Sequence, residues 1–163
     1  MPKAKTLDDL FLETLKDIYY AEKQILKALP KMARGAESPE LAAAFQKHRD
    51  ETEIHVERLQ QIFEILDKPA RGKTCDAILG IIEEGKEVLE EFNGSVALDA
   101  GLTAAAQAVE HYEIARYGTL KAWATQLGMR EAAGLLDQTL KEEIKTDEAL
   151  SKLGIGKANP KAA

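Results

Sequence analysis

Most of this 163-residue chain carries apolar side chains at steps of three and four positions, the spacing that places them on one face of an α-helix. No stretch alternates apolar and polar residues for long, and β-branched residues are sparse, so strands are not expected. We therefore predict an all-α protein. Its helices are expected at about 7–35, 39–66, 76–92, 95–128 and 129–153.

The connections between these helices indicate how the helices pack. Short loops follow the first helix and the fourth helix, so each of them forms an antiparallel hairpin with the next helix. A longer crossover, which carries the short third helix, joins the two hairpins. This connectivity is that of a ferritin-like four-helix bundle. We expect one domain over residues 1–163, with its core at about 6–153 and a flexible C-terminal tail at about 155–163.

Each long helix interrupts its apolar stripe near its middle with side chains that can bind a metal ion. In the fourth helix, for example, two glutamates stand among the apolar positions between Val109 and Leu120. Antiparallel helices rise about 1.5 Å per residue, so residues equally far from a shared turn lie at the same depth. Counting from the two turns places all four interruptions at one level in mid-bundle. The interrupting residues are Glu22, His48, Glu51, His55, Glu110, Glu113, Glu143 and Asp147.

Carboxylates that face a helical core cost several kcal/mol unless a cation meets them. A network of salt bridges would need basic residues at the same level, and Arg116 is the only obvious candidate. Carboxylate oxygens with one or two imidazoles instead suit iron or manganese, and this many carboxylates suit two ions bridged by a glutamate. We therefore predict a centre that holds two iron ions, or two manganese ions.

Roles within this centre are assigned from position along the helices. Glu51 is level with Glu22 and about one turn from His48 and His55, so we predict that it bridges the two ions. Glu51 and Glu113 are the predicted catalytic residues. His48 and His55 are the two alternative candidates for the nitrogen ligand.

Composition excludes several other classes of protein. The formal net charge of −6 argues against a nucleic-acid binder and disfavours a DNA-protecting shell. No apolar run reaches the roughly 18 residues of a membrane span, and the amino terminus lacks the apolar segment of a signal peptide. The single cysteine, Cys75, cannot form an internal disulfide. We therefore expect a cytoplasmic protein with neither a membrane nor a nucleic acid as its partner.

Four motifs of the chain resemble a known family. These motifs, "AEKQI", "AFQKHRDETEIHVERL", "VEHYEIARYGTL" and "LKEEIKTDEAL", look like those of the YciE/YciF family of bacterial stress proteins, which are ferritin-like in fold. The resemblance extends from about Thr6 to Leu153. It implies a dimeric five-helix protein with a non-haem di-iron centre and a role in oxidative or general stress. The ligand candidates that it carries over by position are Glu22, Glu51, Glu110, Glu113, Glu143 and Asp147.

The chain departs from the usual metal motif of ferritin-like proteins. Two helices of such proteins usually carry Glu-x-x-His. Here Glu51 precedes His55 by four residues, and Asp147 stands on the fifth helix where a histidine is expected. The ligand spacing on these two helices therefore differs from that of the usual di-iron site.

Two kinds of function are open to such a chain. A di-iron centre would act on dioxygen or hydrogen peroxide, as a ferroxidase or as a catalase-type enzyme. The alternative is a metal-poor structural stress protein whose buried acids are protonated or paired. A homodimer is expected in either case, because the run "AGLTAAAQAV" permits close helix approach and the third helix is more apolar than a crossover requires.

Overall fold

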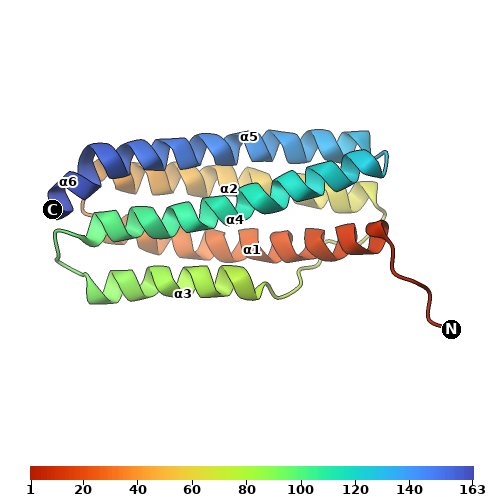
Figure 1. Cartoon of the computed structure of the whole chain (residues 1–163), viewed down its shortest axis with the longest axis horizontal. Helices are drawn as coiled ribbons and strands as arrows, with labels where there is room; N and C mark the ends of the chain where they lie inside the picture. Colours follow the sequence, from red (N-terminus) through yellow and green to blue (C-terminus); the bar gives the residue numbers. More distant parts are fainter.

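The computed structural model describes residues 1–163, and most of them lie in long helices (Figure 1). The prediction of an all-α fold is confirmed, and only the fourth helix begins more than one residue away from its expected start. None of the helices combines the length and the apolar character that crossing a membrane requires. The main helices are α1 (Leu7–Gly35), α2 (Pro39–Ile65), α3 (Asp76–Glu91), α4 (Leu98–Gln126) and α5 (Arg130–Leu153).

The four long helices form two antiparallel hairpins that pack side by side (Figure 1). The first hairpin consists of α1 and α2, and the second consists of α4 and α5. Helix α3 lies in the crossover and packs against α4 and α1, so it covers one of the two seams between the hairpins. The other seam, between α2 and α5, has no helix over it. The predicted ferritin-like bundle with an extra crossover helix is therefore confirmed.

Local signals in the sequence explain where the first two helices begin. Thr6 and Asp9 form a capping box at the start of α1. The hydroxyl of Ser38 accepts the backbone N–H of Leu41 at the start of α2. Asp99, which is buried on α4, accepts the backbone N–H groups of Glu37 and Ser38 at 2.8 Å each. The turn of the first hairpin is thereby fixed to the start of the second.

The small residues of α4 pack within the chain, against α3. A Cβ atom added at Gly101 would lie 2.6 Å from Cγ1 of Val88, and one added at Gly85 would lie 3.6 Å from Cβ of Ala105. The close helix approach that the small-residue run permits is therefore made between α4 and the crossover helix. The expected homodimer needs a different surface.

The chain continues as a helix beyond α5, where the sequence predicts a flexible tail. A π-helical turn, η1 (Gly154–Ala158), leads into the short helix α6 (Asn159–Ala162). Two lysines of this segment form ion pairs with the turn of the first hairpin, Lys157 with Glu40 and Lys161 with Glu37. The segment after α5 is therefore held against the end of the bundle.

Candidate metal centre

Six ionisable side chains from all four long helices meet in the middle of the bundle. Each of them is at most 2% exposed to solvent. Helices α1 and α5 contribute one side chain each, whereas α2 and α4 contribute two. The six residues are Glu22, His48, His55, Glu110, Glu113 and Glu143.

These side chains form two groups with the spacing of metal ligands. The His48 group consists of His48, Glu110, Glu113 and Glu143, and the His55 group consists of Glu22, His55 and Glu143. Within each group, one donor atom from every residue lies within 4.8 Å of the others. Glu143 belongs to both groups, so its carboxylate is the one placed to bridge two ions.

The donor atoms lie at ion-pair distance from one another but without the angles of a hydrogen bond. Nε2 of His48 lies 2.8 Å from Oε1 of Glu110, and Nδ1 of His55 lies 2.7 Å from Oε1 of Glu143. None of these four atoms has a partner with hydrogen-bond geometry, and the same holds for both oxygens of Glu22 and Glu113. Buried polar atoms without partners are costly and rare. Their convergence on shared spaces fits a cation better than it fits a network of hydrogen bonds.

A second carboxylate orients one of the histidines. Nε2 of His55 lies 2.8 Å from Oε2 of Glu142, and the guanidinium of Arg58 holds both oxygens of Glu142 at 2.6 and 2.9 Å. With a proton on Nε2 donated to Glu142, the lone pair of His55 is on Nδ1, which faces Glu143. A metal-binding histidine almost always donates its other ring N–H to a carboxylate, a backbone carbonyl or a water molecule, and Glu142 supplies such a carboxylate here.

Glu142 and Arg58 are residues that the sequence analysis missed. The available signal was their spacing, since Arg58 follows His55 by three positions and Glu142 directly precedes Glu143. That signal becomes meaningful only when α2 and α5 are known to lie side by side.

The structure does not bring Glu51 or Asp147 into either group. The side chain of Glu51 is 25% exposed, accepts the hydroxyl of Thr146 at 3.2 Å and lies 3.8 Å from the Lys47 ammonium. Asp147 lies 3.1 Å from Nε2 of His111 and is 20% exposed. Glu51, the predicted bridging residue, therefore lies outside both groups, and Glu143 is the residue that they share. The two histidines between which the nitrogen ligand was left open lie one in each group.

No arginine or lysine neutralises the cluster. Arg116, the one basic candidate from the sequence, instead lies over the ring of Tyr112, with its guanidinium carbon 5.2 Å from the ring centroid. The only basic groups among the six clustered side chains are the two imidazoles. Four buried carboxylates therefore face two histidines, which leaves an excess of acid that protons or metal ions must offset.

Burial makes several of these acids hold their protons. Removal from water raises the pKa of Glu110 and of Glu113 well above the usual value, and the nearby Glu143 raises both further. Burial also raises the pKa of Glu22 to about 7. Without a metal ion, Glu110 and Glu113 therefore favour the neutral, protonated form, and Glu22 binds its proton more tightly than an exposed glutamate does.

Glu143 and His55 form the charged pair of the cluster. Burial acts to raise the pKa of Glu143, but Glu110 and His55 outweigh it and lower that pKa to about 2. Burial acts to lower the pKa of His55, but Glu143 and Glu22 outweigh it and raise that pKa to about 9. The pKa of His48 is lowered, chiefly because that ring is buried. An incoming metal ion must therefore displace protons from acids and from His55, while His48 is already neutral.

Tyr117 on α4 adds a phenol beside the cluster. Its side chain is fully buried and its hydroxyl has no hydrogen-bond partner. The ring is edge-on to that of His55, with centroids 6.4 Å apart. Burial raises the pKa of this phenol well above its usual value, so it stays a neutral O–H donor. An unpaired donor at this depth is a further sign that the centre accommodates an additional group.

Comparisons with known proteins agree with this architecture. Residues 6–163 match a family described as a domain of unknown function, DUF892. Protein YciF of Escherichia coli K12 is 46% identical over 159 residues, which are 97% of this chain and 96% of YciF. The crystal structure of this E. coli stress protein superposes with a TM-score of 0.91, covering 96% of this chain and 99% of the other.

Two further structures share the fold. YcfI of Rhodopseudomonas palustris, which has been described provisionally as a structural protein, is 46% identical with a TM-score of 0.88 over 90% of this chain and 94% of its own. A protein of Xanthomonas campestris pv. campestris is 23% identical with a TM-score of 0.75, over 95% and 94% of the two chains, and shows the fold alone. This chain therefore belongs to the DUF892 family of YciF-like stress proteins.

Proposed function

We propose that the protein binds two iron ions, or two manganese ions, at its buried cluster and uses them in a redox reaction with a small oxidant. The His48 group would hold one ion and the His55 group the other, and Glu143 is the residue that the two groups share. The observation that carries this proposal is the set of buried donor atoms that converge without hydrogen-bond partners. A donor set rich in carboxylates, with one imidazole for each ion, suits iron and manganese.

The side chains around the cluster perform distinct tasks in this proposal. If these residues hold two ferrous ions, the ions would supply the two electrons that, with two protons, reduce dioxygen to hydrogen peroxide or hydrogen peroxide to two waters. Glu110 and Glu113 give up their protons as a cation approaches. Glu142 and Arg58 hold the His55 ring in one orientation. The hydroxyl of Tyr117 remains a hydrogen-bond donor beside the cluster, where its side chain is shielded from solvent.

A structural role is the second candidate. The charge balance of the metal-free cluster supports it. Glu143 pairs with protonated His55, while Glu110 and Glu113 are neutral, so the cluster can persist without a metal ion. The provisional description of YcfI as structural is consistent with this alternative.

Metal analysis separates the two candidates. The protein is purified without chelators or a histidine tag, loaded anaerobically with ferrous ion and freed of excess iron. We expect about two ions per chain, and faster consumption of dioxygen or hydrogen peroxide than with free ferrous ion. No more than trace iron after loading would contradict the proposal and favour the structural role. If iron binds but does not speed the consumption of dioxygen or hydrogen peroxide, the centre binds metal without catalysing the reaction.

A further inference from the structure

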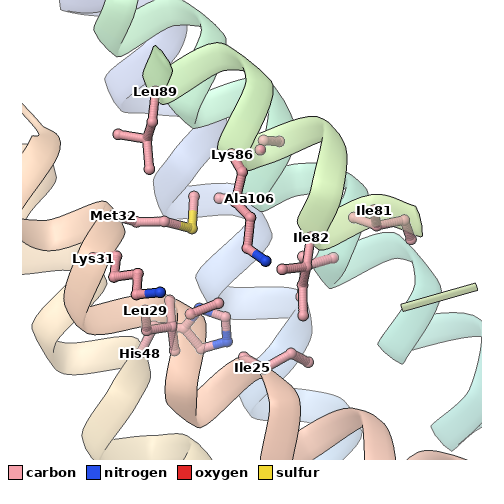
Figure 2. Close-up of a pocket in the computed structure, with 14 residues that line it drawn as sticks. Ile25, Leu29, Lys31, Met32, His48, Ile81, Ile82, Lys86, Leu89 and Ala106 are labelled. Atoms are coloured by element: carbon pink, nitrogen blue, oxygen red, sulfur yellow. The ribbon is translucent and has the colours of Figure 1, made fainter. Parts of the chain in front are cut away.

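An apolar pocket leads from the surface to His48. It lies between α1, α3 and α4, and Figure 2 shows His48 of α2 at its inner end. The cavity has a volume of about 30 Å³, which is room for about one or two molecules the size of water. Its apolar walls include Ile25, Leu29, Met32, Ile82, Ala106 and Val109.

The lining of this pocket selects against polar molecules. Ten of the fourteen lining residues are hydrophobic, and a water molecule needs two to four polar partners to be stable in a cavity. Lys31 of α1 and Lys86 of α3 also line the pocket, and Figure 2 shows their ammonium ends directed into the space between the apolar side chains, where their positive charges disfavour the entry of a cation. A small, neutral, apolar molecule is the occupant that these walls favour.

His48 also borders a second opening of a different character. A cleft of about 230 Å³ lies on the uncovered seam between α2 and α5, and charged side chains, Glu51, Glu142, Lys47 and Lys145, line it. His48 is 2% exposed and neither of its ring nitrogens has a hydrogen-bond partner. The polar cleft suits metal ions, protons and hydrogen peroxide, whereas the apolar pocket suits none of them.

We propose that the apolar pocket is a binding site for dioxygen, through which dioxygen reaches the metal centre at His48. This inference rests on the proposed function and makes it more specific, because it assigns to the oxidant a route separate from the polar cleft. Dioxygen is about the size of the cavity, is uncharged and loses little hydration on entering a dry apolar site.

Xenon tests the pocket directly, because it binds apolar cavities and carries no chemistry of its own. Crystals of the wild-type protein under xenon pressure should show the gas between Ile82, Ala106 and His48. Ala106→Val adds two carbons to the wall of the cavity and should remove the xenon. The matched control is Ala104→Val, the same change on an exposed face of the same helix, and it should leave the xenon in place.

Kinetics with two oxidants tests the route. In the iron-loaded protein, Ala106→Val should slow ferrous oxidation by dioxygen severalfold, leave oxidation by hydrogen peroxide unchanged and leave the iron content at the wild-type value. Because Ala106 is buried, Ile82→Phe at the half-exposed mouth gives a second obstruction if the first variant does not fold.

The possible results are distinguishable. Wild-type crystals without xenon in the pocket, or an unchanged dioxygen rate in a variant that has lost xenon, would overturn the proposal. An equal loss of rate with both oxidants would also overturn it, because it would mean a damaged centre. If the wild-type protein binds no iron, the proposed function fails together with the role of the pocket, and metal analysis alone reveals this.

Discussion

Oε1 of Glu143 lies 2.7 Å from Nδ1 of His55, while its other oxygen, Oε2, lies 3.9 Å from Nε2 of His48. A single carboxylate on α5 thus faces both imidazoles of α2, one with each oxygen. A bridging ligand between two metal ions needs this arrangement. The residue that the two ligand groups share is therefore Glu143 of α5, and Glu51 of α2 lies outside both groups.

Glu143→Gln should reduce the iron content from about two ions per chain to one or fewer, because it removes the charge shared by both ligand groups. The fold should persist, since glutamine has nearly the same volume and His55 can lose its proton. Elemental analysis and circular dichroism measure the two effects. Glu51→Gln is the matched control, the same change at a partly exposed glutamate outside both ligand groups, and should retain both ions. Two ions in the Glu143 variant would refute the bridging role.

Glu142→Gln should weaken the ion at the His55 group by roughly 10- to 100-fold and leave the other ion unaffected, as expected for a carboxylate that orients a metal-binding histidine. Titration against a competing chelator resolves the two affinities. Glu148→Gln, an exposed position on the same helix, is the control and should change neither. An equal loss of affinity for both ions would show that Glu142 acts through its negative charge on the whole cluster and not by orienting His55.

The fold and the depth of the site could be predicted from the sequence because both depend on regular helix geometry. The three- and four-residue spacing defines the helices, and the short loops make the hairpins antiparallel. Counting along such hairpins places Glu22 and Glu113 at a common level, and the structure brings both into the cluster.

Depth alone does not determine which side chains point inward. Each residue advances about 100° around a helix, so Glu51 lies about 60° from His48 in one direction and Thr52 about 40° in the other. The inner face of α2 contains His48, Thr52 and His55, and Thr52 is fully buried there. Thr52 therefore takes the inward position that the prediction gave to Glu51.

The environment of His55 and the two openings at His48 depend on contacts between helices distant in sequence. Arg58 meets Glu142 only because α2 packs against α5, and the apolar pocket exists only because α3 covers α1 and α4. A single sequence carries no signal of these contacts without the fold.

The homodimer stays a prediction, and exposed apolar side chains indicate where it would form. Phe92 and Val96 are 42% and 58% exposed at the connection between α3 and α4, and Leu79 of α3 is 38% exposed. We expect a dimer by light scattering at micromolar concentration, and we expect Phe92→Asp to shift it toward the monomer. Ile144→Asp on α5 is the control. A monomeric wild-type protein would refute the dimer, and a dimeric Phe92→Asp variant would exclude this surface.

Stability of the metal-free protein should fall as the pH rises from about 6.5 to 9. Over this range the folded chain binds more protons than the unfolded chain, because the pKa of His55 is raised to about 9 and those of Glu110 and Glu113 are raised well above 4.5. The pKa of His48 is lowered, so this residue makes stability rise with pH. It does so only below about pH 6.5, the usual pKa of histidine.

Bound metal should reverse this dependence, because the ions compete with the same protons and bind more tightly as the pH rises. Thermal unfolding followed by circular dichroism, with and without iron or manganese, measures both trends. Glu110→Gln should flatten the decline of the metal-free protein, since an amide cannot release a proton, and the same change should weaken metal binding. A Tm of the metal-free protein that rises over this range would show that Glu110, Glu113 and His55 do not retain their protons, and the cluster would then need a cation even in the resting protein.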